Sequence, residues 1–206
     1  MTSADPLLPG GDGHTPLDDD ERRGLKLSYV STRGELNEAE QAGILDAVGR
    51  RPPPVDELLD DRYLRRLHQT MFGRVWTWAG RYRRTETNIG VAPAEIAVAV
   101  RLLVDDARAW VADGPAPAAA DDAAVRFHHR LVSIHPFPNG NGRHSRLAAD
   151  YLALGVGRPR FGWGLGSAGS ADEQRRRYLD ALRCADRGDL APLVAFARGD
   201  GTTPRS

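Results

Sequence analysis

Apolar residues recur at helical spacing through most of this chain. In the segment Pro93–Asp113 they follow one another at steps of four and three, which places their side chains on one face of an α-helix. The segment Asp121–Ile134 shows the same separation of faces and must end at His135, because a proline follows. The apolar positions are Ile96, Val100, Leu103, Ala107 and Trp110 in the first segment, and Ala124, Val125, Phe127, Leu131, Val132 and Ile134 in the second.

Capping residues and helix breakers set the ends of the other predicted helices. Asn37 can cap a helix over Glu38–Val48, with Glu40 at its third position, and the prolines from Pro52 onward forbid its continuation. Further helices are expected from Asp60 to Phe72, from the capping pair Ser170 and Glu173 through Ala185, and from the capping residue Asp189 to just before Gly199. Another helix follows a short glycine-rich turn, is marked by Leu147, Ala148, Tyr151, Leu152 and Leu154, and is closed by Gly155.

One stretch departs from the helical period. Between Trp76 and Val91, aromatic and β-branched residues alternate with polar ones around Asn88 and Gly90, which predicts a short β-hairpin. The whole pattern predicts an all-α bundle of six or seven helices with one small hairpin and no internal repeat.

The length of 206 residues suits one domain with short appendages. The first 24 residues combine prolines, glycines and an acidic run without an apolar period, which predicts a flexible arm. We expect the folded domain over residues 25–199 and a disordered tail over residues 200–206.

Charge and cysteine content narrow the function classes. The 28 basic and 28 acidic side chains cancel, so no net charge draws the protein to nucleic acid or to anionic lipid. Cys184 is the only cysteine, which excludes an internal disulfide and a two-cysteine redox or zinc site and fits the cytoplasm. No run approaches the ~18 apolar residues of a membrane span, and the first residues lack the layout of a signal peptide.

The sequence HPFPNGNGRHSR at residues 135–146 is the stretch that core packing does not explain. Two glycines and two asparagines form a tight turn that leads into a predicted helix. A helix start offers unpaired backbone N–H groups and the positive end of the helix dipole, and glycine lets a phosphate approach that backbone closely. Gly140, Asn141, Gly142 and Arg143 are therefore predicted to bind an anionic group.

Two arginines and a histidine complete this predicted site. Arg143 and Arg146 lie three residues apart on one helix face and can converge on the same anion as planar forks. His135 ends the preceding helix and is expected to face the anion from the other side. There an imidazole with an ordinary pKa near ~6.5 can accept a proton from a hydroxyl.

The string resembles the signature of the Fic family (filamentation induced by cAMP), HxFx(D/E/N)GNGRxxR. Three further segments are similar to family members. Trp76–Arg83 resembles the entrance of the Fic flap, Tyr178–Leu182 resembles the C-terminal helix, and Ser31–Glu40 is similar to the small Fic proteins called mobile mystery protein B. The resemblance covers roughly residues 25–199.

The resemblance implies AMPylation, the transfer of AMP from ATP to a Ser, Thr or Tyr hydroxyl of a target protein with release of pyrophosphate. By position, His135 would be the general base, and Asn139 would hold Mg²⁺ between the α- and β-phosphates. The predicted nucleotide-binding residues are Gly140, Asn141 and Gly142 around the phosphates, with Asn141 also contacting them through its side chain, Arg143 at the β/γ end, Arg146 in support, and Tyr178 beside adenine or in the core.

The family's flap holds a target segment as an extra strand. In this chain the predicted flap residues are Thr85, Glu86, Thr87, Asn88 and Ile89. The similarity to mobile mystery protein B implies a toxin-like role with a helix-turn-helix, antitoxin-like partner. The family resemblance also allows a homodimer.

Two departures from the family pattern bear on activity. Asn139 stands where many active members carry a carboxylate, and an amide oxygen binds Mg²⁺ without a negative charge. Many members are silenced by a helix with the pattern (S/T)xxxE(G/N), whose glutamate pairs with the second motif arginine. Ser31 to Glu35 has this spacing but Leu36 follows, so Glu35 is either an inhibitory residue or part of a helix entry.

Several alternatives stay open. A packed core position explains His128 better than a ligand role, and His135 has the alternative role of a helix C-cap. A zinc site among the histidines lacks an i, i+4 pair with a carboxylate nearby. The alternative functions are a catalytically silent Fic fold that binds nucleotide or protein, and a Fic relative that transfers phosphate or another nucleotide.

Overall fold

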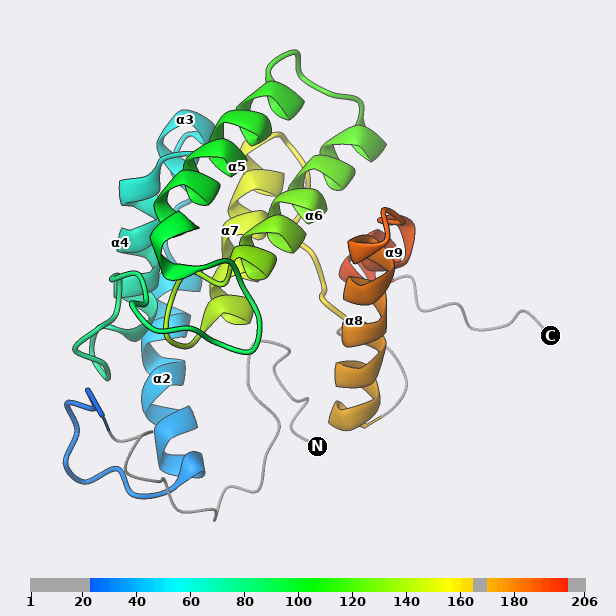
Figure 1. Cartoon of the computed structure of the whole chain (residues 1–206). Helices are drawn as coiled ribbons and strands as arrows, with labels where there is room; N and C mark the ends of the chain where they lie inside the picture. The colour runs from blue at the N-terminus through cyan, green and yellow to red at the C-terminus, as the bar shows by residue number, and fades with distance from the viewer. Residues whose placement is uncertain (1–22, 165–169, 200–206) are drawn as a thin grey trace.

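The protein is a bundle of helices in the computed structural model, which describes residues 23–164 and 170–199 (Figure 1). No strand occurs in these two ranges, which agrees with the predicted all-α class. The elements in chain order are α2 (Arg33–Val48), α3 (Val55–Leu58), α4 (Asp61–Phe72), the 3₁₀ turn η1 (Pro93–Glu95), α5 (Ile96–Val111), α6 (Pro117–Ile134), α7 (Asn141–Gly155), α8 (Ala171–Asp186) and α9 (Ala191–Arg198).

Helix α2 begins earlier than predicted, at Arg33 instead of Glu38. Its N-cap is Thr32, whose side chain accepts a hydrogen bond from the backbone N–H of Glu35, while the Glu35 carboxylate accepts one from the backbone N–H of Thr32. This capping box satisfies two donors at the helix start, so Asn37 lies inside the helix and is not its cap.

The other predicted helices are confirmed, with shifts at some starts, but the N-cap of α9 is Leu190 and not the predicted Asp189. Asp60 caps α4, and Ser170 with Glu173 forms the predicted capping box of α8. Helix α6 begins at Pro117, before the predicted Asp121, because a proline suits the first turn of a helix. The short α3 and the turn η1 were not predicted as separate elements.

Helix α6 packs against α5, α7 and α9, and α2 packs against α4. Figure 1 shows α8 and α9 side by side, and they are in direct contact. The predicted apolar face of α6 is buried at Phe127, Leu131 and Ile134. Each such side chain contributes about 1.5–3 kcal/mol on burial. This core holds the ends of α6 and α7 in a fixed relation.

The segment predicted as a β-hairpin is a loop without strand pairing. At one end the backbone N–H of Arg83 donates to the Pro136 carbonyl (2.9 Å), and at the other the N–H of Val91 donates to the Ile134 carbonyl (3.3 Å). Because these donors bond to the last residue of α6 and to the segment just after it, they do not pair the two arms with each other. The alternating side chains thus mark an extended loop anchored at both ends.

Within the described ranges, no helix is long and apolar enough to cross a membrane. The predicted flexible arm, apart from Arg23 and Gly24, and the predicted tail lie outside the described residues. Near the start of the described chain, Leu25 forms an isolated antiparallel bridge with Trp76.

Candidate functional site

The sequence motif occupies the loop between α6 and α7 and the first turns of α7. His135 is the C-cap of α6 and has left-handed backbone angles, φ 53° and ψ 58°. Gly140 is the N-cap of α7 with φ 78°. A residue with a Cβ adopts this region at a cost of about 1–2 kcal/mol, which glycine avoids. The surroundings of His135 must therefore hold it in this conformation.

Asn141 closes the loop from inside. Its buried side chain accepts a hydrogen bond from the Phe137 N–H through Oδ1 (2.9 Å) and donates from Nδ2 to the Phe137 carbonyl (2.8 Å). Both ends of the amide are used in this way. Asn141 therefore shapes the loop, and the predicted contact with a phosphate would use the second N–H of Nδ2.

His68 of α4 contacts the same loop through a hydrogen bond to Asn139 and through its packing on Phe137. Its Nδ1 lies 3.0 Å from the backbone nitrogen of Gly80, and because an N–H can only donate, Nδ1 is the acceptor. The ring proton is then on Nε2, which donates to the Asn139 carbonyl (3.0 Å). The ring also stacks on Phe137 with a centroid distance of 3.8 Å. Burial is the main reason that the pKa of His68 lies well below its ordinary value, so the ring stays neutral.

The first three N–H groups of α7 belong to Asn141, Gly142 and Arg143, and a helix provides no carbonyl for these positions. A Cβ added at Gly142 would meet no heavy atom within 4 Å, so this backbone borders open space. A Cβ added at Gly140 would lie 2.6 Å from the ring of Phe72. With the positive end of the helix dipole, this helix start can bind an anion.

The Arg143 side chain points into the protein. Its Nη1 donates to Glu40 Oε2 (2.6 Å), and its guanidinium lies 4.8 Å from the ring centroid of Phe72. Glu40 is 2% exposed, and its other oxygen accepts a hydrogen bond from Trp76 Nε1 (2.6 Å). In this conformation Arg143 forms a buried ion pair that joins α7 to α2.

The Arg146 side chain has different neighbours. Its guanidinium lies over the ring of Tyr178, 4.2 Å from the centroid. Tyr178 is buried, with its hydroxyl 3.1 Å from Nε2 of the buried His128, and burial raises the pKa of that hydroxyl. The core positions of His128 and Tyr178 agree with their structural interpretations. The guanidinium groups of Arg143 and Arg146 therefore have different partners, Glu40 for the first and the Tyr178 ring for the second.

Asn139 is exposed on the loop. Its side-chain Oδ1 accepts a hydrogen bond from the Gly140 N–H (2.6 Å). In the described part of the chain, no group of three or more His, Cys, Asp or Glu side chains could hold a metal ion. A single neutral amide oxygen suits Mg²⁺ only when phosphates and water supply the remaining ligands.

His135 is half-buried, and the loop that follows Tyr82 is hydrogen-bonded to the backbone around it. Burial lowers the pKa of its imidazole, and the positive charge of Arg83 lowers it further. The imidazole is therefore neutral near pH 7, which is the form that can accept a proton.

The predicted flap residues are exposed. Thr87 Oγ1 donates to the Ile89 carbonyl (2.5 Å), and the Ile89 side chain is 60% exposed. Glu86 and Asn88 are exposed as well. The Thr85 carbonyl accepts a hydrogen bond from Arg83. The loop thus presents its side chains to solvent while its base is fixed.

Glu35 does not contact a motif arginine. Its carboxylate accepts hydrogen bonds from the backbone N–H groups of Ser31 (2.7 Å) and Thr32 (3.1 Å), which lower its pKa. In this structure Glu35 is therefore part of the helix entry, which is the second of its two predicted roles. The carboxylate that does contact a motif arginine is Glu40.

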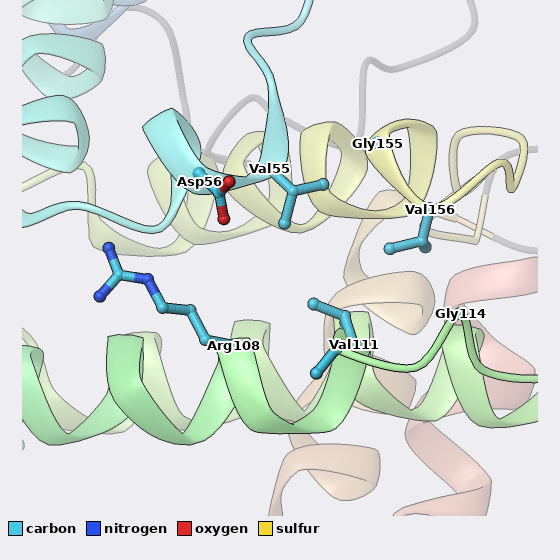
Figure 2. A pocket seen from close by; sticks show the side chains of 8 residues that line it. Val55, Asp56, Arg108, Val111, Gly114, Gly155 and Val156 are labelled. Carbon is cyan, nitrogen blue, oxygen red and sulfur yellow. The ribbon is translucent and has the colours of Figure 1, made fainter.

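A cavity of about 490 Å³ lies at the far end of α7 (Figure 2). Figure 2 shows Val55, Val111 and Val156 pointing toward one another across it. The cavity is also lined by Gly155, the last residue of α7, so it lies roughly 20 Å along the helix from the motif at 1.5 Å per residue. It is separate from the candidate site.

Sequence reasoning gave no site role to His68, Glu40 or Arg83, and it placed Glu40 only at the third position of a predicted helix cap. His68 and Glu40 lie on helices that pack together, and their polar groups are buried, so each needs a partner. Arg83 ends the segment that resembles the flap entrance. A buried charge in an otherwise apolar face was the available signal for Glu40.

Comparison with known proteins gives a family match and curated relatives. Residues 58–153 match the Fic/DOC family. The chain is 30% identical over 135 residues to the protein adenylyltransferase Fic of Drosophila willistoni, a match that covers 63% of this chain and 25% of the relative. It is 38% identical over 73 residues to the protein adenylyltransferase Fic of Aedes aegypti, covering 35% and 13%. The chain thus matches a quarter or less of the length of these relatives.

Solved structures share the fold. The BepC protein of Bartonella tribocorum, with bound AMPPNP, has a TM-score of 0.64 at 18% identity, covering 84% of this chain and 87% of that chain. The N-terminal Fic domain of a cell filamentation protein from Bartonella quintana, with bound ADP, has a TM-score of 0.66 at 17% identity, covering 83% and 86%. These likenesses establish the helical architecture of the domain.

Proposed function

We propose that this chain transfers AMP from ATP to a Ser, Thr or Tyr hydroxyl of a target protein, because its residues 58–153 match the Fic/DOC family. The observation that carries the proposal is the closed loop between His135 and Asn141. It joins a neutral imidazole at the end of α6 to the anion-binding start of α7. The adenine nucleotides AMPPNP and ADP bound by two proteins of the same fold support ATP as the substrate.

In the proposed reaction, His135 removes the proton from the target hydroxyl as its oxygen attacks the α-phosphorus. The bond from that phosphorus to the bridging oxygen of pyrophosphate breaks, and pyrophosphate leaves. The N–H groups of Asn141, Gly142 and Arg143 stabilise charge on the phosphate oxygens. Arg143 and Arg146 are proposed phosphate ligands, and the Arg143 guanidinium must share or leave Glu40 to reach a phosphate. The loop of Thr85 to Ile89 is proposed to hold the target segment.

Mg²⁺ is proposed as the cofactor, with Asn139 as its protein ligand. The amide oxygen of the exposed residue Asn139, beside the helix start, suits an ion that is held mainly by phosphates and water. When bound, Mg²⁺ would neutralise charge between the α- and β-phosphates.

A nucleotide-binding module without turnover is the second candidate. Two observations favour it: Arg143 is engaged by Glu40, and Asn139 has no negative charge for a metal. The third candidate function is that of a Fic relative that transfers phosphate or another nucleotide.

Labelled ATP distinguishes these candidates. The protein is incubated with α-labelled or γ-labelled ATP, Mg²⁺ and a cell lysate, and wild type is compared with His135→Ala and with the control His129→Ala on the same helix. AMP transfer predicts protein label from the α position only, lost in His135→Ala and retained in the control. Label from the γ position only would indicate phosphate transfer. ATP binding without protein label would favour the binding module.

Three further proposals concern the location of the protein, its partner and its oligomeric state. The single cysteine supports a cytoplasmic location. The similarity of Ser31–Glu40 to mobile mystery protein B supports a toxin-antitoxin system with a helix-turn-helix partner. A homodimer is the proposed oligomeric state, which size-exclusion chromatography with light scattering tests.

A further inference from the structure

Three consecutive backbone carbonyls around His135 accept hydrogen bonds from the loop that follows Tyr82. The Pro136 carbonyl accepts from the Arg83 N–H (2.9 Å), and the Ile134 carbonyl accepts from the Val91 N–H (3.3 Å). The carbonyl of His135 itself accepts from Arg83 Nε (2.7 Å). The two ends of the loop 84–90 are therefore tied to the residues on either side of His135.

The Arg83 side chain also binds the loop itself. It is buried, its Nη1 donates to the Thr85 carbonyl (3.0 Å), and its Nη2 donates to the Val91 carbonyl. Within the described ranges, all the hydrogen bonds of this guanidinium go to backbone carbonyls. Its charge is thus held by dipoles and not neutralised by a carboxylate, so it acts on nearby groups.

Gly90 completes the contact. It has φ +109°, and a Cβ there would lie 2.6 Å from Arg83 Nη2 and 2.7 Å from the Cβ of His135. Only glycine allows this approach. The loop, the guanidinium and the Cβ of His135 are therefore in close contact at Gly90.

We propose that Arg83 is the positioning residue of His135. Its planar fork binds three carbonyls at once, which keeps His135 in its left-handed conformation and fixes the loop 84–90 beside it. A lysine ammonium cannot reproduce this fork. The importance of this role for AMP transfer rests on the proposed function, whereas the effect on His135 itself does not.

The electrostatic consequence follows from the same geometry. After burial, the charge of Arg83 is the next cause of the lowered pKa of His135, and the Val132 carbonyl acts in the opposite direction. Arg83, from the loop after Tyr82, is the charged side chain that acts on this imidazole. Loss of the Arg83 charge is therefore expected to raise the pKa of His135.

The direct test is a titration of His135 by NMR in the full-length protein, with its signal assigned from His135→Ala. Arg83→Gln is expected to raise the pKa of His135, while Arg83→Lys keeps the charge and leaves that pKa near the wild-type value. Arg108→Gln is the matched control, because Arg108 also donates to a backbone carbonyl, that of Leu59, away from the motif. An unchanged pKa in a folded Arg83→Gln variant would overturn the proposal.

Arg83→Lys carries the test if Arg83→Gln does not fold. Faster hydrogen exchange is expected at the Arg83 and Val91 amides, together with a roughly hundredfold lower kcat for AMP transfer and a nearly unchanged KM for ATP. Exchange and kcat both at wild-type levels would also overturn it. If the wild-type protein transfers no AMP, the proposed function fails alone, because the titration and the exchange still report on Arg83.

Discussion

At the scale of single residues, the most consequential contact is the ion pair of Glu40 and Arg143. Both side chains are removed from solvent, and Trp76 donates to the same carboxylate. A buried pair of this kind adds little compared with an apolar pair of the same size, but the loss of one partner leaves a buried charge alone. Arg143 can therefore pack in this buried position only when α2 is folded and places Glu40 beside it.

We predict that Glu40→Gln lowers the free energy of unfolding by about 3–5 kcal/mol. The substitution keeps the shape of the side chain and removes the negative charge that compensates Arg143. Urea unfolding followed by circular dichroism measures the change. Glu38→Gln, on the exposed side of the same helix, is the control and is expected to stay within about 0.5 kcal/mol of wild type. Equal changes in the free energy of unfolding for the two variants would contradict the compensating role of Glu40.

At the scale of elements, His68 connects α4 to the segment before the flap and to the motif loop. One ring nitrogen serves Gly80 and the other serves Asn139. A ring that lacks both nitrogens would leave a buried donor and an acceptor unsatisfied, at about 1–3 kcal/mol each. The orientation of the Asn139 carbonyl, and with it the turn into α7, depends on this bridge.

We therefore predict that His68→Phe, which retains the stacking on Phe137, destabilises the protein by about 2–6 kcal/mol and weakens ATP binding. His68→Gln, which can keep one of the two hydrogen bonds, is expected to fall between His68→Phe and wild type. Calorimetric titration with ATP and urea unfolding give the two readouts. His129→Phe is the comparison, since His129 pairs with Asp186 on the outside of α6. Unaltered ATP affinity in a folded His68→Phe protein would contradict the bridging role.

Local signals made most element ends predictable. The capping box at Ser170 and the stop before Pro136 involve residues within a few positions of one another, so the sequence alone specifies them. The direction of Arg143 was not predictable in the same way, because its partner Glu40 lies 103 positions earlier in the chain. The motif predicts which residues would meet a ligand, but long-range packing decides where their side chains point.

At the scale of the whole molecule, three fully buried histidines make stability depend on pH. Burial lowers the pKa of His144 to about 4 and those of His68 and His128 well below 6.5. The unfolded chain binds protons at these rings near pH 6.5, whereas the folded chain does not. Their contribution is therefore complete above pH 6.5 and is lost as the pH falls toward the folded-state pKa values.

Asp150 acts in the opposite direction. Burial raises its pKa to about 6, so between about pH 6 and pH 4 the folded chain holds a proton that the unfolded chain has released. Three fully buried histidines against one carboxyl leave a net uptake of about two protons on unfolding near pH 5.5, and the lowered pKa of His135 acts in the same direction as the three histidines. At about 1.4 kcal/mol per proton and pH unit, stability is expected to fall by about 3 kcal/mol per unit between pH 6 and pH 5.

Urea unfolding at pH 7.5, 6 and 5 measures this slope. Asp150→Asn keeps the oxygen that accepts hydrogen bonds from Phe161 and Trp163, and it removes the opposing titration. The variant is therefore expected to lose stability more steeply below pH 6 than wild type. A wild-type free energy of unfolding that stays constant from pH 7.5 to pH 5 would contradict this prediction. It would mean that the three rings are protonated as readily in the folded protein as in the unfolded chain, against the cost of burying a charge.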